Sequence, residues 1–158
     1  MTTQTLYNLC LTTHIIGFIL FAGTTVVEFF VFQQFRRLVA DPPIIRKTTL
    51  NTIARFPPLM GIGIVVTILA GVGMMAITKG VFGEQLWMKI KIVLVVLALL
   101  NGIFFRRLQV EKLDTLMENV EVRGSEKLTA LTRNLSVYHY IQMLIFAAII
   151  TLSVFKLA

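Results

Sequence analysis

Cysteine and charge are what this chain has least of. Cys10 is the single cysteine among 158 residues, which excludes an intramolecular disulfide and a cysteine cluster. Charged residues make up 15% of the chain, whereas a soluble domain carries about a quarter. A soluble domain and a disulfide-linked one are therefore both excluded.

Long apolar runs stand in place of charge, and 56% of the residues are hydrophobic. Four of these runs cover about 6–33, 57–78, 86–105 and 135–157. Each is close to the roughly 20 residues that a helix needs to cross about 30 Å of hydrocarbon. Transmembrane strands are excluded, because they have about 10 residues in strict alternation. We predict an all-α integral membrane four-helix bundle that forms one domain over 1–158.

The first run has no basic segment before it and no small-residue cleavage site after it, so we expect it to be a membrane helix rather than a signal peptide. Of the 15 lysines and arginines, most lie in the first and third connections, whereas the second connection has only Lys79 and the tail only Lys156. Basic residues mark the cytoplasmic side of a membrane protein. We therefore expect a multi-pass protein of the cell inner (cytoplasmic) membrane, with both the N- and C-termini on the outer side.

The placement of the basic residues also favours the lipid bilayer as partner and argues against nucleic acid. In the third connection, 106–133 has the pattern of an amphipathic helix broken at Gly124-Ser125, which predicts a cytoplasmic segment. The glycines of 57–78 predict that this helix lies at the centre of the bundle. They also leave a homo-oligomer open, because glycine faces let membrane helices associate. The substrate stays unknown at this stage.

Two ionisable residues lie in the outer half of the expected membrane region. His14 lies about 12 Å, and Lys91 about 8 Å, from the outer face by helical rise. Lys89 lies nearer the surface, where a lysine can extend its ammonium to water, and Lys91 has this alternative as well. An imidazole at the depth of His14 is costly unless it binds a partner or a ligand. We therefore predict a functional site at His14 with Lys91.

A second polar layer is expected on the inner side, formed by Glu28, Asn101 and His139. These three residues each lie about one turn from the inner end of their helix. Glu28 and His139 have a purely structural interpretation too, as an ion pair and as part of an interfacial aromatic belt. His14 and Glu28 differ by about 40° around a helix, so both are predicted to face the same interior.

Three kinds of chemistry suit these residues. A neutral imidazole in an apolar bundle is a natural axial ligand to haem iron, although the different depths of His14 and His139 argue against one haem shared by both. Copper is a second possibility, because several methionines supply soft donors, although such methionines more often serve packing. Proton or ion transfer through Glu28 and the histidines is the third.

Several short motifs carry a family resemblance. His14-Ile15-Ile16-Gly17 resembles the first helix of the CopD-type and HemJ-type (protoporphyrinogen oxidase-like) four-helix bacterial membrane proteins. Arg55-Phe56-Pro57-Pro58-Leu59-Met60 is similar to the entry of their second helix, and Trp87-Met88-Lys89-Ile90-Lys91 to the start of their third. The resemblance spans nearly the whole chain.

The resemblance implies haem b in the bundle, with His14 as the ligand of its metal and Lys91 as a catalytic group that binds a porphyrin propionate. Ser136-Val137-Tyr138-His139-Tyr140 stands where the family has asparagine-glutamate-proline, so the scaffold and a cofactor are implied more strongly than the oxidase reaction. We therefore expect a haem-b-binding redox protein. The alternatives are a small transport or metal-handling protein of CopD-like type, and a structural membrane subunit that docks a partner through 106–133.

Overall fold

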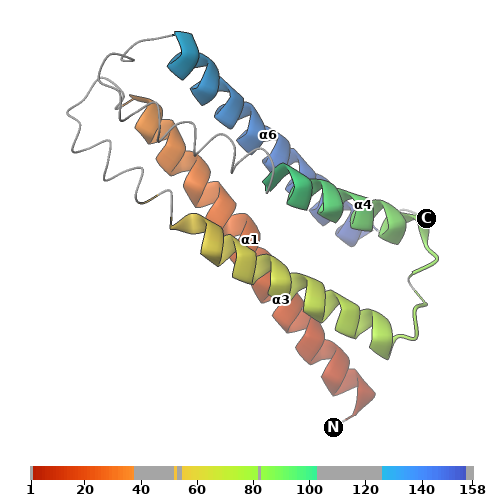
Figure 1. Cartoon of the computed structure of the whole chain (residues 1–158). Helices are drawn as coiled ribbons and strands as arrows, with labels where there is room; N and C mark the ends of the chain where they lie inside the picture. Colours follow the sequence, from red (N-terminus) through yellow and green to blue (C-terminus); the bar gives the residue numbers. More distant parts are fainter. Residues whose placement is uncertain (1, 38–51, 53–54, 82, 103–125, 156–158) are drawn as a thin grey trace.

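The computed structural model describes residues 2–37, 52, 55–81, 83–102 and 126–155. Within these ranges the protein is all-α, with four helices and no strand, as the sequence predicts (Figure 1). The helices are α1 (Thr3–Arg37), α3 (Phe56–Ile77), α4 (Leu86–Leu100) and α6 (Glu126–Phe155).

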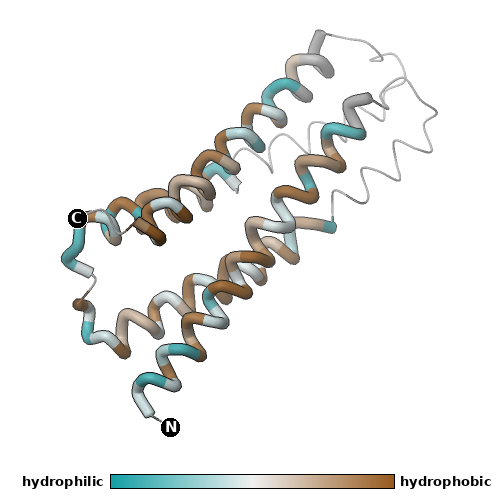
Figure 2. The backbone as a smooth tube through the Cα atoms, turned by 180° about the vertical axis from the view of Figure 1, so that it is seen from behind, coloured by the Kyte–Doolittle hydropathy of each residue, from teal (hydrophilic) through white to brown (hydrophobic). Residues whose placement is uncertain are grey.

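Three of these helices contain segments long and apolar enough to cross a membrane, namely Thr3–Gln34, Phe56–Ile77 and Arg133–Phe155. Large apolar side chains point outward from them; Leu69 is 66% exposed and Leu144 is 70% exposed. Figure 2 shows hydrophobic residues along all four helices. An outward-facing apolar surface of this extent is stable only against lipid or another protein.

The helix ends differ from the predicted runs in a regular way. α3 keeps almost the predicted bounds, because Pro57 and Pro58 occupy its first turn, where a missing N–H costs nothing. α1 continues to Arg37 and α6 begins at Glu126, so both extend beyond their apolar runs. Most of the predicted cytoplasmic segment 106–133 lies outside the described residues, and its last part belongs to α6.

α1 and α6 each contact two other helices. α1 packs along α3 and also contacts α6, and α4 packs against α6 (Figure 1). The prediction that the glycine-rich helix α3 lies at the centre is therefore wrong. The glycines of α3 serve one close contact with α1 rather than contacts on all sides. The first residues of α1 and the last residues of α6 lie at the same end of the bundle (Figure 1); that this end faces outward stays a prediction.

The α1–α3 contact brings two backbones against each other. A Cβ atom added to Gly63 would lie 2.7 Å from the backbone nitrogen of Phe21, and one added to Gly17 would lie 2.8 Å from that of Thr67. Neither distance leaves room for a side chain. Gly63, Thr67 and Gly71 recur every four residues and so form one face of α3. Small residues on such a face allow membrane helices to approach closely.

We predict that Gly63→Ala destabilises the bundle by about 1–3 kcal/mol, because the new methyl group overlaps the α1 backbone. Gly61→Ala is the matched control on the same helix, since a Cβ there meets nothing within 4 Å. Alanine gains helix propensity at both sites, so Gly61→Ala is expected to be neutral or to stabilise by up to about 1 kcal/mol. Unfolding in mixed detergent micelles, followed by circular dichroism, measures both. Equal stabilities would contradict the backbone contact.

Candidate functional site

The polar residues of α1 meet two different neighbours. His14 lies against α3, whereas Glu28 lies against His139 of α6. The sequence predicted that both face the same interior. They face different helices, because α1 contacts α3 along the part that holds His14 and α6 along the part that holds Glu28.

His14 is fixed by a backbone carbonyl of α3. Its Nδ1 lies 2.7 Å from the carbonyl oxygen of Thr67. A carbonyl oxygen only accepts hydrogen bonds, so Nδ1 carries the proton and donates it. The ring also lies over Gly71, where a Cβ would be 3.3 Å from both Nδ1 and Cε1. In the neutral ring this leaves the lone pair of Nε2 free to bind a ligand.

Lys91 lies on α4, half-buried, and close enough to His14 for its positive charge to act on the imidazole. That the two residues form one functional site stays a prediction. Lys89, two positions earlier on the same helix, is exposed. No acidic side chain among the described residues lies within ion-pair distance of Lys91.

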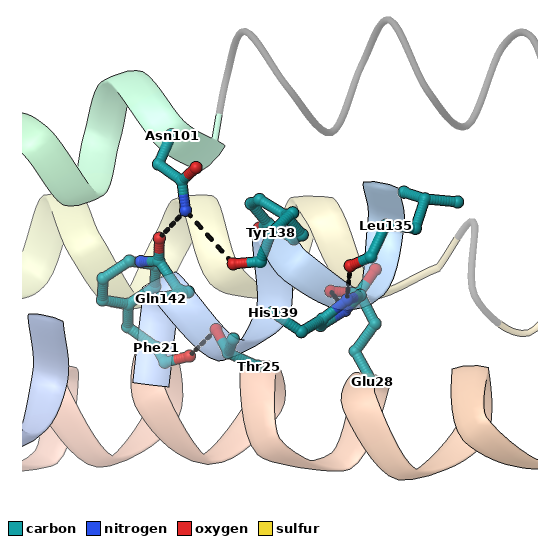
Figure 3. A network of polar contacts seen from close by, with 8 residues as sticks. All are labelled: Phe21, Thr25, Glu28, Asn101, Leu135, Tyr138, His139 and Gln142. Carbon is teal, nitrogen blue, oxygen red and sulfur yellow. Dashed lines mark hydrogen bonds and ion pairs between the residues drawn. The ribbon is translucent and has the colours of Figure 1, made fainter. Parts of the chain in front are cut away.

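Glu28 and His139 form a buried pair between α1 and α6 (Figure 3). Glu28 Oε2 lies 3.8 Å from His139 Nε2, and the two residues are 1% and 2% exposed. His139 Nδ1 donates to the carbonyl oxygen of Leu135 at 2.7 Å. Its ring stacks on Phe32, with centroids 5.4 Å apart. This environment holds the imidazole in one orientation, with Nε2 toward the carboxylate.

Asn101 was predicted to lie in one polar layer with Glu28 and His139, and in the structure it contacts α6 at Tyr138 and Gln142, on either side of His139. Its Nδ2 donates to Gln142 Oε1 at 2.8 Å and approaches the carbonyl oxygen of Tyr138 at 3.4 Å (Figure 3). Sequence reasoning missed Gln142. Its spacing of three residues from His139 was an available signal, because that spacing places two residues on one helix face.

The buried polar side chains of the described residues all lie on α1 and α6. They are Thr24, Thr25, Glu28, Ser136, His139 and Gln142. The two threonines donate their hydroxyls to carbonyls of their own helix, Leu20 and Phe21. The α1–α6 contact thus contains buried polar groups beside aromatic rings such as Phe21 and Phe146, whereas the α1–α3 contact is made through glycines.

The described part of the chain contains no group of three or more histidine, cysteine or acidic residues that would hold a metal ion. Cys10 faces Gly73, with Sγ 3.2 Å from the position of a Cβ there. A metal held by several protein ligands is therefore not built from these residues. A group that needs only one protein ligand is compatible with His14.

These observations define an all-α integral membrane protein with ionisable groups inside its helix bundle. The chain belongs to the DUF2269 family of predicted integral membrane proteins, whose model matches residues 8–157. This match supports membership of a membrane protein family and does not extend to the CopD-type or HemJ-type proteins. Comparison with curated proteins and with solved structures gives no match.

We predict a measurable coupling between Asn101 and Gln142, because their hydrogen bond links α4 to α6. A double-mutant cycle with Asn101→Leu and Gln142→Leu is expected to give about 0.6 kcal/mol, and at most about 1.7 kcal/mol, as for other hydrogen bonds between membrane helices. Asn134, exposed on α6, supplies the control cycle, in which Asn101→Leu and Asn134→Leu should be additive. Additivity in the Gln142 cycle as well would show that the bond contributes nothing.

Proposed function

We propose that this integral membrane protein binds haem b inside its bundle for redox chemistry of the HemJ-like kind, with His14 as an axial ligand. The observation that supports this most is the hydrogen bond from His14 Nδ1 to the Thr67 carbonyl. Ligating histidines commonly donate their other N–H to a carbonyl or carboxylate, which orients the ring and makes the ligating nitrogen more basic. In His14 the nitrogen that remains available to ligate a metal is Nε2.

The surrounding residues fit such a group. The glycine face of α3 lies beside the imidazole ring of His14, and Gly71 places no side chain against that ring. Lys91 supplies a half-buried positive charge near His14, which suits a porphyrin propionate. His139 does not fit as a second axial ligand, since its Nε2 faces Glu28. The proposal is therefore ligation by one histidine.

When bound, haem supplies one-electron redox chemistry, and its potential depends on the axial ligand and its hydrogen bonds. The chain supplies the rest. Thr67 orients His14 through its carbonyl. Lys91 would bind the anionic group and is the candidate catalytic residue, and the apolar helix faces would exclude water. We place the protein in the cytoplasmic membrane with both termini outside, because the basic residues cluster in the first and third connections.

The test is the absorption spectrum of the protein purified in detergent after expression with sufficient haem. We expect a Soret band in the wild type and its loss in His14→Ala, because the axial ligand is removed. His139→Asn is the matched control for the second histidine and is expected to keep the band. A colourless wild type that takes up no haem on reconstitution would refute the proposal. It would leave transport or metal handling, which the buried Glu28–His139 pair favours, or a structural role.

Lys91 is tested separately from His14. Lys91→Met removes the charge and keeps much of the apolar volume, so we expect haem affinity to fall about tenfold, which corresponds to ~1.4 kcal/mol. Lys89→Met, an exposed position on the same helix, is the control and should leave the affinity unchanged. Haem titration of the apoprotein measures both variants. Equal affinities in the two would exclude Lys91 from the site.

A further inference from the structure

The Glu28–His139 pair has no part in the proposed haem site, although both side chains are among the most buried of the described residues. The pair lies on α1 and α6, away from the α1–α3 contact that holds His14. An ionisable pair at membrane depth is costly to keep and is commonly functional.

The two nitrogens of His139 have different environments. Nδ1 donates its proton to the Leu135 carbonyl, so in a neutral ring Nε2 carries only a lone pair. Nε2 is buried, has no hydrogen-bond partner among the described residues, and faces Glu28 Oε2. A carboxylate oxygen is an acceptor as well. Two acceptors facing each other gain nothing until a proton lies between them.

We infer that Nε2 of His139 is a proton-binding site inside the membrane, with Glu28 as the group that receives the resulting N–H. The proton comes from water and adds to the Nε2 lone pair, giving an imidazolium next to a carboxylate, and its release restores the neutral ring. The present separation of 3.8 Å is longer than a hydrogen bond. A charge-assisted bond of this kind is about 2.8 Å long, so binding the proton draws Glu28 and His139 together by about 1 Å.

Among the described residues, the other groups to consider around the pair lie on the neighbouring helices. On α6, Ser136 is buried and neutral, Tyr138 and Tyr140 flank His139, and Arg133 is exposed. On α1, the phenyl ring of Phe29 is tilted against the imidazole, with centroids 5.8 Å apart, and Thr25 donates to its own helix. On α4, Asn101 is neutral and bonds to Gln142. Lys91, also on α4, acts on His14, and Arg55, before α3, is exposed.

The chain contains two histidines, so labelling histidine with ¹⁵N gives signals from only two rings. The experiment uses the full chain without haem, in detergent, and follows the ring nitrogens between pH 5 and pH 9. We expect Nε2 of His139 to change from the unprotonated to the protonated chemical shift as the pH falls. His139→Asn assigns the signals, and the His14 ring reports that the fold is kept.

Glu28→Gln is expected to lower the proton affinity of His139 tenfold or more, because the carboxylate no longer stabilises the imidazolium. Glu84→Gln, at an exposed position between α3 and α4, is the control and should leave the midpoint unchanged. Glu28→Asp, which keeps the charge, should retain part of the affinity.

An Nε2 that stays in one protonation state from pH 5 to pH 9 in the wild type would overturn the inference, as would an unchanged midpoint in Glu28→Gln. The wild-type titration tests whether Nε2 of His139 binds a proton even if Glu28→Gln does not fold. Because the experiment needs no haem, its result is separate from that of the absorption spectrum: a colourless protein can still bind this proton, and a haem protein can lack the site.

Discussion

The close approach of α1 and α3 is the constraint on which the rest of the arrangement depends. Gly17 and Gly63 let the two backbones touch, and no side chain fits between them. In lipid, helices gain little from hiding apolar surface, so close packing of this kind supplies much of the association energy. The same contact holds the His14 ring at hydrogen-bond distance from a carbonyl of α3.

The contrast between the two sides of α1 follows from the membrane as a solvent. A polar side chain in hydrocarbon needs a partner, and the chain satisfies this need in two ways. Thr24 and Thr25 donate to carbonyls of their own helix and therefore make few demands on their neighbours. His139 does the same through Nδ1, whereas its Nε2 faces Glu28 across the α1–α6 contact and Gln142 bonds to Asn101. The α1–α6 contact thus combines polar groups with aromatic rings, whereas the α1–α3 contact is made through glycines.

Much of the fold could be predicted from length and composition alone. Four helices follow from four apolar runs, and Pro57 and Pro58 fixed the start of α3 to within one residue. The ends of α1 and α6 could not be predicted in this way, because a helix can continue beyond the hydrocarbon and the apolar pattern stops there. Depth along a helix also placed Glu28 near His139, as the structure has them.

Other parts of the site had no usable sequence signal. Depth does not specify which neighbour a residue faces, so the bond of Asn101 to Gln142 was not predicted, and His14 and Glu28 were assigned to one common interior. The partner of His14 is the backbone carbonyl of Thr67. Every residue carries a backbone carbonyl, so the sequence contains no signal that predicts this contact. The packing of α3 mainly on α1 was missed for a related reason. A glycine face shows that a helix is approached closely, and it does not show by how many neighbours.

The hydrogen bond from His14 uses a carbonyl oxygen that also belongs to the backbone ladder of α3. A carbonyl oxygen has two lone pairs, and within α3 the oxygen of Thr67 already accepts the N–H four residues on, that of Gly71. The imidazole takes the second lone pair. The same oxygen therefore serves the hydrogen-bond ladder of α3 and also holds a ring of α1. Anything that changes how strongly His14 donates acts on a backbone carbonyl of a helix to which His14 does not belong.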